Sequence, residues 1–225
     1  MESVGLDLTR FSSSWNVIVP VVYFVFWNSE SYLNYAEDVK KYILRSILFK
    51  YYASGTTGKL KQMRDNINQN DYILSVQSID LIPGLHLTNN MVEDIMLEEK
   101  GSRVVSEALF YLGADWCVNS NYDLDHLHPS ISFERLPAGV NQNDWRQWSK
   151  LKNKLPNLHL YAPTLNIAKS DYPLDQFVGM MNQAQKDTFY YQGIIPVNQS
   201  LAIINFGDFY EERKNELVRR ITELL

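Results

Sequence analysis

The chain of 225 residues contains a single cysteine, Cys117. One thiol excludes an internal disulfide and a thiolate zinc cage, and it favours a reducing, cytoplasmic compartment. Glycine and proline are also few, at 10 and 8 residues, while 45% of the residues are hydrophobic. This composition excludes the collagenous and low-complexity classes and indicates a globular protein with its own hydrophobic core.

The sequence has no hydrophobic run long enough to cross a bilayer. The strongest run, residues 17–27, is interrupted by Pro20 and falls short of the roughly 20 residues that a transmembrane helix needs. No basic segment precedes it and no small-residue cleavage site follows it, so we expect neither a signal peptide nor a membrane anchor. The run predicts a buried helix.

An excess of basic residues is also missing. Lysine and arginine number 21 against 26 aspartates and glutamates, which gives a net charge of −5. Such a balance argues against a protein that coats nucleic acid through bulk electrostatics. The acidic excess lies mainly in residues 1–120, and five basic residues with no acidic one between them lie from Arg146 to Lys169. This stretch fits either a positive patch or a solvated face.

The first half of the chain shows helical spacing. Apolar residues recur on one face between residues 17 and 50, and the pattern predicts further helices over residues 59–70, 91–100 and 104–112. Pro83 and Gly84 indicate a turn between the helix predicted over residues 59–70 and the one predicted over residues 91–100. We therefore expect a mainly helical module over residues 1–115.

The second half changes character at Asn119, where short strand-like segments begin. Five of the eight prolines lie between Pro129 and Pro173, which favours short elements and turns. The chain closes with a helix predicted over residues 208–225, with an apolar stripe on one face. Its basic residues are expected to face water; they are Arg213, Lys214, Arg219 and Arg220. The predicted fold class is α+β, with a second domain over residues 116–225.

Three polar segments stand out in this second domain. The first runs from Tyr122 to Pro129 and places Asp125 next to His126 at the end of a predicted strand, where adjacent side chains diverge. The second, residues 157–161, alternates apolar and polar residues, as a strand with one buried face does. The third begins a helix near Pro163 on which Asn166 and Lys169 share a face, because they are three residues apart.

These three segments together resemble the HNH (ββα-metal, His-Me finger) endonucleases. The pattern is most similar to the C-terminal nuclease region of GmrSD-type modification-dependent restriction proteins, and type II CRISPR effectors carry a related one. The resemblance implies a ββα-metal nuclease core with flanking helices after the helical module. It also implies hydrolysis of DNA phosphodiester bonds, in a restriction or phage-defence system.

The resemblance assigns a role to each polar residue. His126 is the general base that activates water, and Asp125 and Asn166 are the ligands of one Mg²⁺ or Mn²⁺ ion. Asn157 is a framework residue that ties the two strands together, and Lys169 contacts a phosphate. These residue types suit the chemistry, because a neutral imidazole accepts a proton near pH 7 and hard oxygen ligands suit Mg²⁺.

The implied partners are DNA, modified or unmodified, and a nucleotide-hydrolysing domain or subunit. The Asp-Gly-Gln-Gln-Arg type of motif that marks such a domain does not occur in this chain. The resemblance also has departures: Asn166 stands where the HNH name requires histidine, and the gap between His126 and Asn157 is long. His128 is close enough in sequence to be an alternative ligand.

Other interpretations remain open at this point. The nuclease fold is also compatible with a non-cutting nucleic-acid-binding or regulatory module, or with an interaction scaffold in which the polar cluster is architectural. Lys169 fits a solvated charge as well as a phosphate contact. Trp145 and Trp148, three residues apart in the long gap, favour a core stripe over a base-stacking platform.

Overall fold

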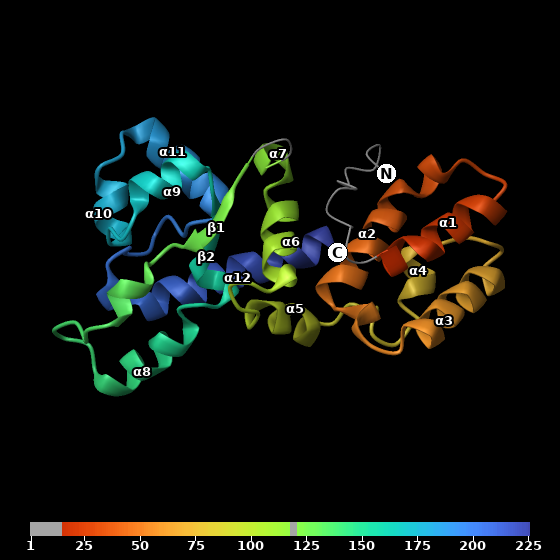
Figure 1. The fold of residues 1–225 in the computed structure, drawn as a ribbon, viewed down its shortest axis with the longest axis horizontal. Coiled ribbons are helices and arrows are strands. Elements are labelled where there is room, and N and C mark those ends of the chain that lie inside the picture. Colours follow the sequence, from red (N-terminus) through yellow and green to blue (C-terminus); the bar gives the residue numbers. More distant parts are fainter. Residues whose placement is uncertain (1–14, 118–120) are drawn as a thin grey trace. The chain divides into compact units, whose positions relative to one another are not determined.

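The computed structural model describes residues 15–117 and 121–225, and they fall into two compact units. The first comprises the described residues up to Met91 together with Leu224 and Leu225, and the second runs from Val92 to Glu223. The described elements are helices and one two-stranded antiparallel sheet, so the broad α+β class is confirmed (Figure 1).

The first unit is helical throughout its described part, as expected. Its core forms around the second helix, whose side chains Val39, Tyr42 and Ile43 are almost inaccessible to solvent. The Tyr42 hydroxyl lies 2.8 Å from that of Tyr52. The helices of this unit are α1 (Ile18–Trp27), α2 (Ala36–Leu48), α3 (Thr56–Gln69) and α4 (Val76–Ile79). Helix α5 (Asn89–Met96) contains the border between the units.

Helix α1 is not the buried helix that its apolar run predicts. Val21 and Phe24 are buried, but Val22 and Phe26 are among the most exposed large hydrophobic side chains. The sequence is apolar on all faces of the helix, so hydrophobicity alone does not distinguish the face that packs from the face that does not.

The second unit contains the sheet. Strands β1 (Asp123–His126) and β2 (Leu158–Tyr161) pair antiparallel, with Asp125 opposite His159. The change of character predicted at Asn119 lies outside the described residues. The helices of this unit are α6 (Arg103–Leu112), α7 (Ala114–Cys117), α8 (Gln142–Leu151), α9 (Pro163–Lys169), α10 (Leu174–Gly179), α11 (Gln183–Gly193) and α12 (Phe206–Leu224).

Strand β2 is buried on both faces, whereas its alternating sequence predicts one buried face. Helix α6 contacts β2 and helix α9 contacts both strands, on the two sides of the sheet in Figure 1. The ring of His159 packs at 5.7 Å against that of Phe189 on α11. The polar residues of the strand are therefore enclosed by neighbouring helices, which the sequence of the strand does not reveal.

The border between the compact units, at residues 91 and 92, lies upstream of the boundary expected at residue 115. The helix predicted over residues 91–100 also ends early, at Met96. The early end of the helix has a structural reason. The chain after Met96 pairs with residues 153–155: Leu155 N–H donates to Glu98 O at 3.0 Å and Lys100 N–H donates to Asn153 O at 2.8 Å.

Arg213 on α12 is fully buried, which corrects the expectation that it faces water. Its guanidinium donates only to backbone carbonyls: Nε to Gly193 O at 3.0 Å, Nη2 to Leu158 O at 2.9 Å and Nη1 to Pro156 O at 2.6 Å and Leu155 O at 3.3 Å. Burial lowers the pKa of Arg213 to about 9, so the group stays charged at neutral pH. One side chain thus fixes the start of β2 and the end of α11 to α12.

None of the helices in residues 15–117 and 121–225 has the length and apolar character required to span a membrane.

Replacing Arg213 by methionine is expected to lower the free energy of unfolding by about 3 kcal/mol or more, because four buried carbonyl oxygens lose their donor. The matched control is Arg219→Met on the same helix. Arg219 makes only exposed ion pairs with Glu216 and Glu223, so its loss should change stability far less. Urea unfolding of both variants checks this, and equal effects would contradict the structural role given to Arg213.

Candidate active site

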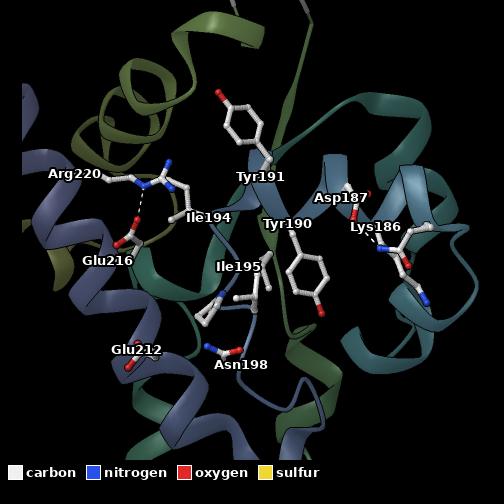
Figure 2. Close-up of a pocket in the computed structure, with 13 residues that line it drawn as sticks. Lys186, Asp187, Tyr190, Tyr191, Ile194, Ile195, Asn198, Glu212, Glu216 and Arg220 are labelled. Atoms are coloured by element: carbon white, nitrogen blue, oxygen red, sulfur yellow. Dashed lines mark hydrogen bonds and ion pairs between the residues drawn. The ribbon is translucent and has the colours of Figure 1, made fainter.

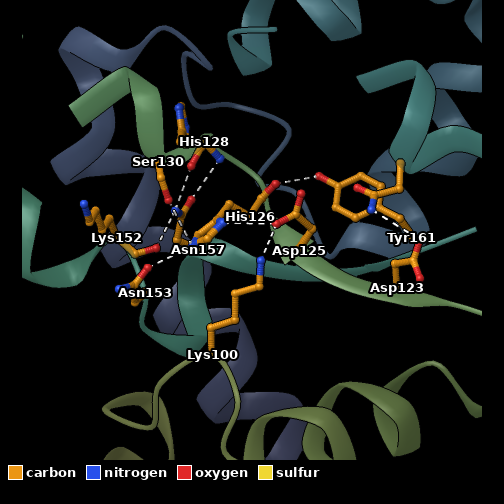
Figure 3. Close-up of polar contacts among 11 residues, drawn as sticks. Lys100, Asp123, Asp125, His126, His128, Ser130, Lys152, Asn153, Asn157 and Tyr161 are labelled. Carbon is orange, nitrogen blue, oxygen red and sulfur yellow. Dashed lines mark hydrogen bonds and ion pairs between the residues drawn. The ribbon is translucent and has the colours of Figure 1, made fainter. Parts of the chain in front are cut away.

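Two of the three polar segments of the second unit meet at the end of the sheet nearest His126 (Figure 3), while Asn166 of the third contacts Asp123 at the other end of β1. Strands β1 and β2 are followed by helix α9, which contacts both. This β-β-α order arises because residues 123–126 and 158–161 have strand patterns, while Pro163 is favourable at the first turn of a helix. The hydroxyl of Tyr161 donates to the carbonyl oxygen of His126 at 3.1 Å and fixes the end of β1.

Asn157 ties the segment after β1 to the segment before β2. Its Oδ1 accepts from the backbone N–H of His128 at 2.9 Å, and its Nδ2 donates to His128 O at 3.0 Å and Lys152 O at 2.8 Å. The side chain is completely buried. The Asn157 amide therefore holds the backbone that follows His126 through both its oxygen and its nitrogen.

Asp125 and His126 contact each other, although adjacent strand residues are expected to diverge. The distance from Asp125 Oδ1 to His126 Nδ1 is 3.1 Å. The pair lies at the last two residues of β1, where the alternation of the strand ends. A carboxylate only accepts hydrogen bonds, so Nδ1 carries the proton in this contact.

A second hydrogen-bond donor reaches the same carboxylate oxygen. Lys100 Nζ lies 2.5 Å from Asp125 Oδ1. Burial by itself would raise the pKa of the Asp125 carboxyl, but the hydrogen bonds from His126 and Lys100 outweigh burial and hold the pKa well below its usual range. Asp125 is therefore an anion at neutral pH.

The other imidazole nitrogen of His126 faces two polar side chains. Nε2 lies 2.9 Å from Asn153 Oδ1 and 3.5 Å from Ser130 Oγ. An amide oxygen only accepts hydrogen bonds, so Nε2 as placed donates to Asn153 Oδ1. Nε2 offers a lone pair to a proton only when the ring is neutral with its proton on Nδ1 and Asn153 Oδ1 has moved away from it.

The donor atoms suit a hard divalent cation. Asp123 and Asp125 lie two residues apart on β1, so their side chains leave the same face of the strand. Asn166 Nδ2 donates to Asp123 Oδ2 at 3.3 Å, which brings the amide of α9 to this face. Mg²⁺ is commonly held by one or two carboxylates with waters and substrate phosphates completing its shell. Within the described residues no cluster of three or more His, Cys, Asp or Glu exists that could hold a metal.

Lys169 does not lie at the surface. Its side chain is fully buried, its Nζ has no hydrogen-bond partner among the described residues, and it lies 5.5 Å from the centre of the Tyr161 ring. Burial lowers the pKa of Lys169, while the charges of Asp125 and Asp171 act in the opposite direction. In this arrangement Lys169 supports Tyr161 from within the unit and does not reach a phosphate in solvent.

The two other histidines of this unit are core residues. The ring of His128 packs edge-on against Phe206 and Phe209, at 5.3 and 4.8 Å between ring centres. Burial lowers the pKa of His128 to about 3 and that of His159 well below its ordinary value, and the charge of Arg213 acts in the same direction on both. Both imidazoles are neutral. The ring of His128 points into an aromatic cluster, so His128 is not placed to be the alternative metal ligand.

Trp145 and Trp148 form part of the core, as the favoured interpretation predicts. Trp145 stacks on Phe133 with 5.6 Å between ring centres, and Trp148 packs at 5.9 Å against Phe206. The indole of Trp148 also packs closely against the start of α12. A Cβ at Gly207 would come within 2.9 Å of Trp148 Nε1, so only glycine allows this approach without movement.

A separate cavity of about 710 Å³ opens between α11, the segment after it and α12 (Figure 2). Tyr190 and Tyr191 line it from α11, and Glu216 and Arg220, which form an ion pair of 2.7 Å, line it from α12. None of the residues around Asp125 and His126 contributes to its walls.

Four residues at the candidate active site carry polar contacts that the sequence motifs do not indicate: Lys100, Asp123, Ser130 and Asn153. Asp123 could have been found from its spacing, because it shares a strand face with Asp125. Lys100 and Asn153 carry no such signal. They reach the site through the pairing of residues 98–100 with 153–155, which connects segments far apart in the sequence.

No protein-family model matches this sequence, and neither does any curated protein.

Replacing Asn157 by aspartate is expected to destabilise the protein by about 3 kcal/mol, because two carbonyl oxygens lose their donor and face a buried carboxylate. The control is Asn143→Asp, an exposed change in the first turn of α8 where a negative charge is favourable. Chemical denaturation at pH 7 measures both. A wild-type midpoint for Asn157→Asp would contradict the bridging function of this side chain.

Protonation of the buried histidines predicts a loss of stability in mild acid. His128 and His159 have lowered pKa values in the folded protein, so below the unfolded value of about 6.5 the unfolded state binds more protons. The free energy of unfolding should fall as the pH falls from 6.5 to 4.5, by about 1.4 kcal/mol per pH unit for each histidine. Asp125 titrates below this range and does not contribute.

The variant His128→Leu should reduce the slope of the unfolding free energy against pH by the contribution of one histidine, about 1.4 kcal/mol per pH unit. His86→Leu, at an exposed histidine, should leave the slope unchanged. Urea unfolding at half-unit pH steps gives the slopes. If His128→Leu kept the wild-type slope, His128 would not be a buried neutral group.

Proposed function

We propose that this chain is a metal-dependent endonuclease of the HNH type, which hydrolyses DNA phosphodiester bonds with His126 as general base. The support is threefold: the sequence motifs, the β1-β2-α9 order of the elements, and the polar contacts around Asp125 and His126. We further propose that it acts in the cytoplasm as part of a restriction or phage-defence system, together with a nucleotide-hydrolysing domain or subunit.

One observation supports the reaction above all others, namely the contact between Asp125 Oδ1 and His126 Nδ1 at 3.1 Å. A carboxylate on one imidazole nitrogen selects the tautomer whose other nitrogen accepts a proton, and it stabilises the imidazolium that results. In this proposal Nε2 takes the proton from the attacking water. Asn153 Oδ1, 2.9 Å from Nε2, would give way to this water, with Ser130 Oγ beside it.

The remaining residues of the site have supporting functions in this proposal. Asp125, Asp123 and Asn166 would hold one Mg²⁺ or Mn²⁺ ion, which when bound neutralises charge at the leaving oxygen and the phosphate. Asn157 keeps the backbone after His126 in place through its contacts with His128. Tyr161 fixes the carbonyl of His126, and buried Lys169 lies against the Tyr161 ring. Both orient the base from inside the unit.

Supercoiled plasmid incubated with the full chain is expected to become nicked in Mg²⁺ or Mn²⁺ and to stay intact with chelator. His126→Ala should lower the rate by about 10²- to 10⁴-fold, the usual contribution of a general base, and Asp125→Asn should also lower it strongly. The control is His86→Ala, which changes an exposed histidine of the first unit and should leave the rate unchanged.

The same assay separates the alternatives. Cleavage that survives His126→Ala would remove His126 from the reaction. Salt-dependent DNA binding without metal-dependent cleavage would favour the non-cutting module. A parallel incubation with single-stranded RNA shows whether the activity is confined to DNA.

A further inference from the structure

Lys100 holds the position at Asp125 where a metal ion would be expected. Its ammonium lies 2.5 Å from Oδ1, the same atom that His126 Nδ1 contacts. The side chain is 37% exposed, so it can leave the carboxylate for solvent without crossing the core. A monovalent cation therefore lies on the carboxylate that the proposed function gives to a divalent one.

The backbone of Lys100 is held far more firmly than its side chain. Lys100 N–H donates to Asn153 O, and the neighbouring Glu99 pairs with Lys154 both as a β-bridge and through an ion pair of 3.0 Å. Lys154 Nζ also donates to Leu97 O at 2.7 Å. The Lys100 ammonium thus reaches Asp125 from a segment whose backbone is held in place. This keeps the effective concentration of the ammonium at the carboxylate high.

The charges around the site also affect the attraction of a divalent ion to Asp125. Asp123 and Asp125 supply two negative charges on one face of β1, and Lys100 offsets part of them directly. Lys169 adds a second positive charge that Asp125 and Lys100 both influence. A divalent ion that arrives while Lys100 stays on Asp125 meets a carboxylate whose charge is already compensated, so its attraction to the site is reduced.

We propose that Lys100 is an internal competitor of the divalent cation: its ammonium occupies Asp125 in the metal-free protein and must be displaced before a metal ion binds there. This inference rests on the proposed function for the location of the metal. It goes beyond that function in assigning Lys100 the role of setting the metal concentration at which the site fills.

The test is the binding of Mn²⁺ alone to the full chain, without DNA, followed by the loss of the electron paramagnetic resonance signal of free Mn²⁺. The variant Lys100→Gln removes the ammonium and keeps a side chain of similar length. It should bind Mn²⁺ about ten-fold more tightly than the wild type, as expected for a unit charge at this distance in a half-exposed site. The matched control Lys150→Gln removes one exposed positive charge of the same unit and should bind like the wild type.

A double variant shows whether the gain arises at Asp125. Lys100→Gln combined with Asp125→Asn should bind no more tightly than Asp125→Asn alone, because the two side chains act on one interaction. Circular dichroism of each variant confirms folding at the assay temperature. Unchanged or weaker Mn²⁺ binding by Lys100→Gln, or no binding by any of the proteins at millimolar Mn²⁺, would overturn the proposal.

The outcome of the Mn²⁺-binding test can be distinguished from the outcome of the cleavage assay. Tighter Mn²⁺ binding by Lys100→Gln without cleavage of any nucleic acid would leave the competition standing and remove the proposed function. Metal-dependent cleavage without any change in Mn²⁺ affinity would do the reverse.

Discussion

The candidate active site depends on one buried cation, Arg213, whose partners among the described residues are backbone carbonyls. Arg213 donates to backbone carbonyls in the segment from Leu155 to Leu158 and to that of Gly193. Two strands of four residues each are too short to be stable alone, so the position of β2 is set by what surrounds it. Arg213 supplies part of this support from α12, by holding the backbone carbonyls at the start of β2.

The same support extends to the catalytic candidates in short steps. Asn157 lies inside the segment that Arg213 holds, and its side chain binds the backbone of His128. His128 in turn follows His126 by two residues, so the imidazole is located through backbone contacts on both sides. Asp125 then fixes the tautomer of the ring. The chemistry proposed for Nε2 therefore rests on groups that never approach a substrate.

Much of this arrangement was predictable, for specific physical reasons. Alternating residues and Pro163 predict two strands and a helix, and their motifs brought Asp125, His126 and Asn157 to one place as expected. Arg213 and Lys100 were not predictable. A charged residue on an amphipathic helix is normally solvated, and the carbonyl oxygens that accept from Arg213 are present in every residue, so they leave no mark in the sequence. Lys100 reaches Asp125 only because the helix before it ends at Met96, which its spacing does not reveal.

The contact between Gly207 and Trp148 has an evolutionary consequence. A methyl group at position 207 would press on the indole and push the first turn of α12 outward, and Arg213 lies less than two turns further along the same helix. Sequence drift at this glycine would therefore be limited as strictly as drift at a residue that performs chemistry, although it touches no polar group of the site. Natural variants of this chain should keep glycine there, while the exposed positions of the same helix diverge freely.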